Sequence, residues 1–427
     1  MKDLCEIKQS IIDLCSFESV QQPPLPNMPF GEQVYKALEY TLKLGESFGF
    51  ECINYDGYVG EIIWRGKKDG EPGQTMGILC HLDVVKAGRL SDWKFPPFKA
   101  TEHNGKIYAR GTLDDKGPTI CVLYMMKALK EEGFVPEKTI KLILGCNEES
   151  GWACMNHYAK VAKMPDFGFS PDGEFPVLYA EKGIIHATYT FDCSKEITVV
   201  QGGEMANMVC DYAYAICPIN EELAKGCGLK INGEKLESFG VSAHGSTPDK
   251  GVNAIDKLVL YLAKAGLVDE YVHDCLFKDK YGLKQLNDET GPLTMSPDII
   301  SAKDGKMQIV VDYRYPATLS PEFVLEQLGK IAPFEGGKHH QKPLFNKKDS
   351  TLIQTLLKIY NDETGSNAVP LAIGGGTYAR ALPIGAAFGP EFPGDDAPIH
   401  QPNEYISVEK IELICKIYKR AIYELAK

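Results

Sequence analysis

The chain has 427 residues, of which 46 are lysine or arginine and 58 are aspartate or glutamate, so its formal net charge is −12. Hydrophobic residues make up 44% and charged residues 24%, which is typical of a globular protein and too apolar for a disordered one. A negative chain without a block of like charges is a poor candidate for nucleic-acid binding. No apolar run reaches the ~18 residues that a membrane-spanning helix needs. We therefore expect neither nucleic acid nor a membrane as a partner.

The cysteines and the first residues predict a cytoplasmic protein. The thirteen cysteines are scattered without a CxxC pair, and a chain of this length needs no disulfide framework, so we expect reduced thiols. The first residues carry an early acidic side chain and lack the long apolar core of a secretory signal. Cys80 and Cys146 stand beside the motifs described below, and we interpret both as core side chains.

The first part of the chain predicts alternating helices and strands. Residues 31–50 have helical periodicity, and the short apolar run 76–80 predicts a buried strand. A helix is expected over 117–130, because Pro118 is tolerated at a first helical position. Residues 139–144 and 166–169 predict two further strands. Strand, helix and strand in this order indicate a largely parallel sheet with helices on both faces.

The pattern changes after about residue 182 and returns near residue 344. The expected elements between these points are a strand at 184–191, a helix at 252–265, a strand at 307–313 and a helix at 321–331. A four-stranded sheet with two helices fits this stretch. Beyond it we expect a helix at 350–363, a strand at 386–388 and a last helix behind Ser407, a plausible N-cap. The chain therefore predicts one α/β domain, residues 1–182 and 344–427, interrupted by a smaller domain at 183–343.

Five segments place carboxylates or imidazoles where strands or loops end. They contain His81 with Asp83, Asp114 with Asp115, Glu148 with Glu149, Asp172, and His400. Ligands of open α/β sheets bind beyond the carboxyl ends of the strands, so these segments can share one pocket. Imidazole nitrogen and carboxylate oxygen suit a divalent cation such as Zn²⁺, whereas crowded carboxylates without a cation would repel each other. Each segment alone is common on protein surfaces, but their combination is specific.

The glycine cluster at residues 374–376 does not predict a phosphate-binding loop. It lacks the Gly-Lys-Ser/Thr ending and opens no obvious helix after a strand. We interpret it as a turn in which Gly376 and the hydroxyl group of Thr377 approach a bound substrate closely.

Several strings resemble a known family, the co-catalytic di-zinc peptidases, which includes aminoacylase, acetylornithine deacetylase and carnosinase. They are CHLDVV (80–85), ARGTLDDKGP (109–118), NEESG (147–151), SPDGEFP (170–176) and IHQPNE (399–404). The longer strings SPDGEFPVLYAEKG (170–183) and GGGTYAR (374–380) are most similar to the bacterial PepV-type dipeptidases. The resemblance implies an α/β/α catalytic domain with a mostly parallel sheet, interrupted by an α+β lid domain. It also implies two divalent metal ions, with zinc the first choice and manganese or cobalt as alternatives.

The resemblance also implies a role for each residue of the metal signature. Asp114 would bridge the two metal ions, and the peptide bond after it is typically cis in this family. His81 and Asp172 would complete the ligands of one ion, and Glu149 and His400 those of the other. Asp83 would hydrogen-bond His81 and fix its tautomer. Glu148 would be the general base that takes a proton from the attacking water and passes it to the leaving amine.

Three residues of the inserted region resemble the lid residues of the family. His244 in GVSAHGSTPDKGVNA (240–254) would stabilise the tetrahedral oxyanion, acting in its own subunit or across a dimer. Asn207 in GGEMANMV (202–209) would be a second lid contact. Arg314 in DYRYP (312–316) would anchor the terminal carboxylate of the substrate. A structural histidine and a surface ion pair of the arginine remain the alternatives.

The function implied by the resemblance is the hydrolysis of unblocked dipeptides, with Xaa-His and β-alanyl dipeptides among the candidate substrates. One alternative is an N-acyl amino acid deacylase of the same fold. An alternative of another class is a metal-dependent peptide-binding protein without catalysis, although binding alone would not need Glu148 as a base. The chain is expected to be a monomer or a homodimer.

Overall fold

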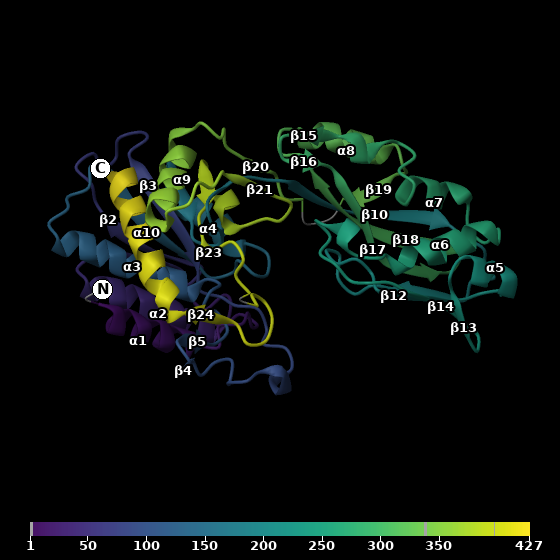
Figure 1. Cartoon of the computed structure of the whole chain (residues 1–427), viewed down its shortest axis with the longest axis horizontal. Helices are drawn as coiled ribbons and strands as arrows, with labels where there is room; N and C mark the ends of the chain where they lie inside the picture. Colours follow the sequence, from purple (N-terminus) through teal and green to yellow (C-terminus); the bar gives the residue numbers. More distant parts are fainter. Residues whose placement is uncertain (1–2, 337–339, 397) are drawn as a thin grey trace. The chain divides into compact units, whose positions relative to one another are not determined.

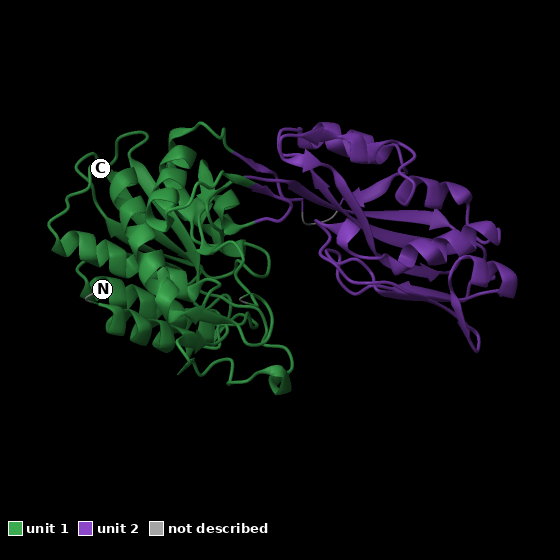
Figure 2. Cartoon of the chain, in the orientation of Figure 1, with its two compact units in different colours: residues 1–179, 346–371, 377–427 green, residues 180–345, 372–376 purple. Residues whose placement is uncertain are grey.

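The apolar runs of the sequence form the strands of two large sheets, each centred in its own structural unit. The computed structural model describes residues 3–336, 340–396 and 398–427. Unit 1 comprises Met1–Tyr179, Asn346–Leu371 and Thr377–Lys427, and unit 2 comprises Ala180–Phe345 and Ala372–Gly376 (Figure 2). The interpretation of these units as a catalytic and a lid domain, with boundaries at 182 and 343, stays a prediction.

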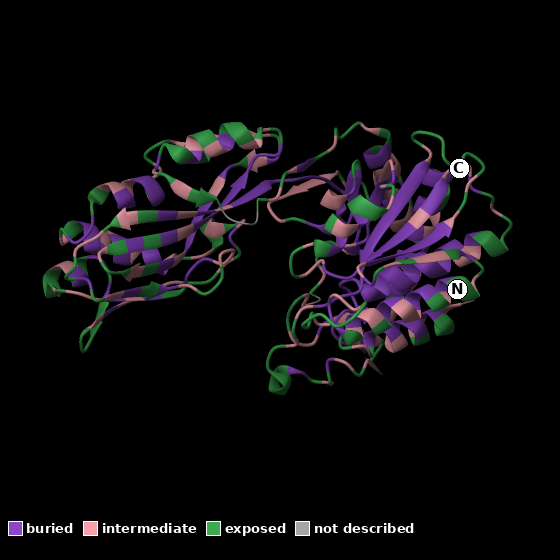
Figure 3. Cartoon of the chain, turned by 180° about the vertical axis from the view of Figure 1, so that it is seen from behind, coloured by how far each residue is buried: buried purple, intermediate pink, exposed green. Residues whose placement is uncertain are grey.

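The central strands of unit 1 are parallel and almost completely buried. The order along the sheet is β1-β2-β6-β3-β7-β22-β9, with parallel pairing from β6 to β22 and antiparallel pairing of β1 and β2 at one edge. Every residue of β3 is buried, which explains its continuous apolar run. Figure 3 shows that the central strands of this unit are buried along most of their length. The main strands are β1 (Glu51–Tyr55), β2 (Val59–Trp64), β3 (Thr75–His81), β6 (Thr139–Gly145), β7 (Phe167–Ser170), β9 (Leu178–Glu181) and β22 (Gly385–Ala387).

Short strands and six α-helices complete the described part of unit 1. The short strands are β4 (Thr101–His103), β5 (Lys106–Tyr108), β8 (Gly173–Glu174), β23 (Pro390–Glu391) and β24 (Tyr405–Ser407). The helices are α1 (Leu4–Cys15), α2 (Glu32–Ser47), α3 (Lys116–Glu131), α4 (Ala153–Val161), α9 (Thr351–Thr364) and α10 (Val408–Ala426) (Figure 1). Helix α10 packs against α3 and α9, while α2 and α4 pack against β2. The buried side chains of α10 recur at helical spacing, so one face of the helix covers the core.

The described part of unit 2 contains one large antiparallel sheet and helices of its own. The strand order is β13-β14-β12-β11-β17-β18-β10-β19. The strands are β10 (Gly183–Asp192), β11 (Val199–Gly202), β12 (Tyr212–Ile216), β13 (Lys230–Asn232), β14 (Lys235–Phe239), β17 (Thr294–Lys303), β18 (Lys306–Tyr315) and β19 (Phe334–Gly336). The helices are α5 (Glu221–Gly226), α6 (Ala254–Lys264), α7 (Glu270–Leu276) and α8 (Pro321–Gly329). Two-residue strands β15 (Asn287–Asp288) and β16 (Gly291–Pro292) form a separate pair.

The predicted four strands and two helices of the inserted region are too few. The described part of unit 2 has an eight-stranded sheet and four α-helices. Two of the missed strands are short and largely exposed: all three residues of β13 are exposed, and so are two of the three residues of β19. Such segments carry no apolar run, and they become strands because a neighbouring strand offers its hydrogen-bonding edge.

The α/β class with a parallel central sheet and an inserted α+β region is confirmed. Strands β20 (Leu344–Phe345) and β21 (Leu371–Ile373) pair with β9 where the chain passes between the units. Within the described residues, no helix has both the length and the apolarity needed to cross a membrane.

Candidate metal centre and substrate-binding residues

The predicted metal ligands of unit 1 lie at the ends of strands and at the starts of neighbouring elements. His81 is the last residue of β3, Glu149 follows β6, and Asp172 follows β7. Because β6, β3 and β7 are adjacent and parallel, their carboxyl ends share one edge of the sheet. Asp114 stands just before α3, and His400 stands in the loop before β24.

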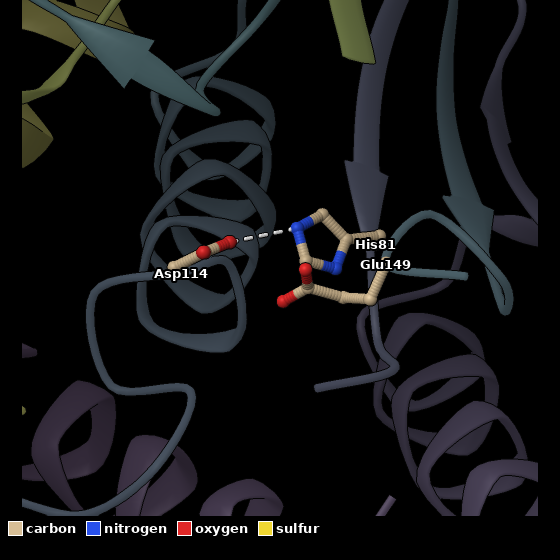
Figure 4. Close-up of side chains that lie close together, drawn as sticks. All are labelled: His81, Asp114 and Glu149. Atoms are coloured by element: carbon tan, nitrogen blue, oxygen red, sulfur yellow. Dashed lines mark hydrogen bonds and ion pairs between the residues drawn. The ribbon is translucent and has the colours of Figure 1, made fainter. Parts of the chain in front are cut away.

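Three of these side chains, those of His81, Glu149 and His400, meet around the carboxylate of Asp114. The candidate ligand atoms of His81, Asp114 and Glu149 all lie within 4.8 Å of one another (Figure 4). The Nε2 atom of His81 is 2.8 Å from Asp114 Oδ1. The Nε2 atom of His400 is 2.8 Å from Asp114 Oδ2 and 3.1 Å from the Glu149 carboxylate. One oxygen of Asp114 therefore faces each imidazole, which is the arrangement that a bridging carboxylate needs.

Asp172 lies near this centre without belonging to its tightest group. Its Oδ2 atom accepts a hydrogen bond from the main-chain N–H of Tyr378 (3.1 Å). Burial opposes the protonation of His81, but the carboxylates of Asp114 and Asp172 raise the pKa of this imidazole well above its usual value. Asp172 is thus close enough to act on the centre electrostatically.

The peptide bond between Asp114 and Asp115 is cis, as the resemblance implied.

The electrostatics of the centre fit a divalent cation. Burial and the charge of Asp114 raise the pKa of Glu149 to about 7, and burial together with Asp172 raises the pKa of Glu148 well above its usual value. On His400, the carboxylates of Asp114 and Glu149 outweigh burial and raise the pKa to about 11. The carboxylates therefore crowd together and need compensating positive charge. Oxygen and nitrogen donors at this spacing match the ligands that zinc and similar ions take.

The main chain of Asp83, rather than its carboxylate, makes the predicted hydrogen bond to His81. The carbonyl oxygen of Asp83 is 3.0 Å from His81 Nδ1, while its Oδ1 atom is 3.7 Å away. A carbonyl can only accept, so Nδ1 donates its proton to Asp83, and Nε2 is the nitrogen left to bind a cation, which it would do through its lone pair after losing its own proton. The buried Asp83 carboxylate instead accepts the main-chain N–H groups of Glu148 (2.9 Å) and Glu149 (3.1 Å). It thereby holds the two glutamates in place.

The side chain of Glu148 has a partner that the sequence did not suggest. Trp152 donates its Nε1–H to Glu148 Oε1 (3.1 Å). Trp152 follows Glu148 by four residues and has a left-handed backbone conformation (φ 61°). The spacing of four is the only sequence signal for this contact.

His244 of unit 2 is held in a defined tautomer by Ser246. The main-chain N–H of Ser246 donates to His244 Nδ1 (3.2 Å), and the Ser246 hydroxyl lies 2.7 Å from the same nitrogen. Burial and the charge of Arg314 lower the pKa of His244 below its usual value. The imidazole is therefore neutral near pH 7 with its proton on Nε2, which makes it a hydrogen-bond donor. The Asn207 carbonyl accepts the main-chain N–H of Gly245 (2.7 Å), so the segments of Asn207 and His244 are neighbours.

Arg314 is a buried residue with several partners and not a surface ion pair. Its side chain is 4% exposed, and that of Asp312 is 0% exposed. Arg314 donates from Nε to both oxygens of Asp312 (2.9 Å each) and from Nη2 to Oδ2 (2.8 Å). Its Nη1 donates to the carbonyl of Gly374 (3.1 Å), which belongs to the glycine cluster. Asp312 therefore fixes the guanidinium.

The turn that contains Gly376 and Thr377 spans the boundary between the two units. Gly376 is exposed. Thr377 is buried, and its hydroxyl oxygen accepts the main-chain N–H of Ala379 (3.3 Å) at the start of a 3-10 helix, Tyr378–Ala381. The hydroxyl thus has a capping contact in addition to its predicted role toward substrate.

Imidazoles and carboxylates gathered at the carboxyl ends of parallel strands form a candidate site for divalent cations. Residues 77–424 match the model of "Peptidase family M20/M25/M40", so the chain belongs to this family. The chain is 37% identical over 436 residues to "Putative dipeptidase YtjP" of Bacillus subtilis, covering 94% of this chain and 93% of that protein. It is 34% identical over 466 residues to "Putative dipeptidase SSP1012" of Staphylococcus saprophyticus, covering 98% of this chain and 97% of that protein. The chain is therefore a metallopeptidase.

Solved structures share the fold at low sequence identity. Aminopeptidase PepT from Bacillus cereus has a TM-score of 0.61 at 16% identity and covers 99% of both chains. Human carnosine dipeptidase 1 has a TM-score of 0.60 at 15% identity and covers 99% of this chain and 96% of that one. These similarities support the fold assignment made above.

Proposed function

We propose that this metallopeptidase hydrolyses unblocked dipeptides, including Xaa-His and β-alanyl dipeptides, into two amino acids. The observation that carries the proposal is the Asp114 carboxylate between two imidazoles, with Glu149 in contact with one of them. The dipeptidase descriptions of the two relatives above support the substrate class. We also propose a cytoplasmic location, which agrees with the thirteen free thiols of the chain.

The proposed metal site holds two divalent ions, zinc in the first place, with manganese and cobalt as alternatives. His81 and Asp172 would bind one ion, Glu149 and His400 the other, and Asp114 both. When bound, such ions would polarise the scissile carbonyl and lower the pKa of a water molecule. The orientation of His81, with Nδ1 hydrogen-bonded to the Asp83 carbonyl and Nε2 facing Asp114, supports this assignment.

The protein side chains would carry out the proton transfers. Glu148 takes the proton of the attacking water and returns it to the leaving amine. Trp152 and the main-chain bond to Asp83 restrict the position of this glutamate, which is what a general base requires. Burial and the neighbouring carboxylates raise the pKa of Glu148, and bound cations would lower it again.

Residues of unit 2, together with Thr377 of unit 1, would recognise the reacting peptide. His244 would donate its Nε2–H to the oxyanion, a contact of a kind whose loss costs about 2.7–4 kcal/mol of transition-state stabilisation. Arg314 would pair with the terminal carboxylate of the substrate and so measure its length, with Asn207, Gly376 and Thr377 as further contacts.

An assay with defined substrates tests the proposal. The protein is treated with a chelator, reloaded separately with Zn²⁺, Mn²⁺ or Co²⁺, and incubated with free dipeptides, tripeptides and N-acetyl or N-succinyl amino acids. We expect cleavage of the free dipeptides only. Cleavage of the acylated compounds alone would identify a deacylase. Peptide binding without hydrolysis in the metal-loaded protein would identify a binding protein.

A further inference from the structure

Glu404 is a charged residue with no solvent exposure in the segment that links His400 to β24. Its Oε2 atom accepts hydrogen bonds from Arg110 Nη1 (2.6 Å) and from the main-chain N–H of Gly111 (3.1 Å). Its Oε1 atom accepts the main-chain N–H groups of Leu113 (3.0 Å) and Asp114 (3.2 Å). Both carboxylate oxygens are thus bound to the single segment 110–114.

This contact joins two segments that each carry a predicted metal ligand. The segment 110–114 ends in Asp114, and Glu404 follows His400 by four residues. The main-chain N–H of Ala109 also donates to the carbonyl of Glu404 (3.2 Å), and β24 pairs with β5 directly beyond these residues. The position of Asp114 relative to His400 therefore depends on Glu404.

The burial of this ion pair calls for an explanation beyond stability. Arg110 and Glu404 are 1% and 0% exposed, so both charges have lost their hydration. Buried ion pairs of this kind are often no more stabilising than apolar residues of similar size. A carboxylate with four donors does, however, fix a loop geometrically, because three of the donors are main-chain N–H groups of different residues.

We propose that Glu404 is a positioning residue for the metal centre, acting through the main chain of Asp114 and through the loop of His400. It orients the Asp114 carboxylate so that one oxygen faces each imidazole. The proposal rests on the metal centre proposed above.

The variant Glu404→Gln tests this role. In the wild type each carboxylate oxygen of Glu404 accepts two hydrogen bonds. The NH₂ group of glutamine cannot accept, so two of the four hydrogen bonds are lost in either orientation of the amide. Calorimetric titration of the chelator-treated protein with Zn²⁺ should show an affinity about 10–100-fold below that of the wild type, the usual effect of removing such a support. An unchanged affinity overturns the proposal.

A matched control separates positioning from general damage to the core. Glu61 is also a buried carboxylate of unit 1, at 1% exposure, with an ion pair to Lys141 (2.7 Å) and a hydrogen bond from Tyr55 (3.0 Å). Glu61→Gln should lower the midpoint of thermal unfolding as Glu404→Gln does, but leave the Zn²⁺ affinity within about threefold of wild type. Equal losses of affinity in both variants would contradict a specific role of Glu404.

Variants of Arg110 separate the loop contacts from charge neutralisation. In Arg110→Met/Glu404→Gln no unpaired charge remains, but the loop contacts of Glu404 are still impaired. We expect its Zn²⁺ affinity to stay low, and recovery to the wild-type affinity would overturn the proposal.

If Glu404→Gln does not fold, as judged by circular dichroism of the chelated protein, Glu404→Asp takes its place, because it keeps the charge but is too short for all four contacts. A wild-type protein that binds no Zn²⁺ would overturn the metal centre itself.

Discussion

Replacing Asp312 by asparagine leaves the buried positive charge of Arg314, in unit 2, without its negative partner. The wild-type carboxylate accepts three N–H···O contacts of 2.8–2.9 Å from this arginine, and water cannot replace them because both side chains are buried. Leaving one partner of a buried ion pair unpaired costs about 3–5 kcal/mol. Asparagine keeps the size of aspartate and one accepting oxygen, so we expect a cost at the lower end of this range. The free energy of unfolding should fall by about 3 kcal/mol.

Urea denaturation followed by circular dichroism measures this loss. The three tryptophans, Trp64, Trp93 and Trp152, all belong to unit 1, so tryptophan fluorescence recorded in parallel reports the unfolding of that unit alone. The double variant Asp312→Asn/Arg314→Met should regain most of the stability, because it contains neither charge. A loss below about 1 kcal/mol in the single variant would refute the account of a buried, uncompensated charge.

The same variant has a kinetic consequence if Arg314 binds the substrate carboxylate. The guanidinium would lose its fixed orientation while the residues of unit 1 remain intact. We therefore expect a larger increase in KM for dipeptides than decrease in kcat. An unchanged KM would argue against a substrate-binding role of Arg314.

Three further predictions concern single residues. Glu148→Gln should keep the metal content of the wild type, while turnover falls by about 10²–10⁴-fold because a general base contributes that much. A loss of metal in this variant would contradict the role of Glu148 as a base. Asp114→Ala should lose both metal and turnover, so two ions retained per chain would argue against bridging. Burial raises the pKa of Asp298 from 3.8 to about 8, so the folded chain keeps a proton that the unfolded chain releases in this range, and this carboxyl makes stability fall as pH rises. Asp298→Asn should therefore gain stability relative to the wild type from pH 4 to 8 in urea denaturation, and a constant difference would refute this.

The buried parallel strands and the long amphipathic helices could be predicted from the sequence. The expected strand at 139–144 is β6, Thr139–Gly145, and the helix behind Ser407 is α10, Val408–Ala426. Both carry their signal in their own residues, as a continuous apolar run or a helical repeat. Helix α1 was missed although Ile7, Ile11 and Leu14 are buried at helical spacing, so its signal was present.

The exposed strands of unit 2 and the supports of the site could not be predicted in this way. Nothing in Lys230–Asn232 distinguishes a strand from a turn, because pairing with β14 creates the strand. The motifs located the carboxylates and imidazoles around Asp114. The contact between Arg110 and Glu404, however, joins residues 294 positions apart, and only the folded chain brings them together.

A crystal structure of the zinc-loaded protein, with anomalous data collected at the zinc edge, tests the central claim most directly. The account predicts two zinc peaks with Asp114 between them, one bound by His81 and Asp172 and the other by Glu149 and His400. Zinc peaks elsewhere on the chain, or none within reach of the Asp114 carboxylate, would contradict it.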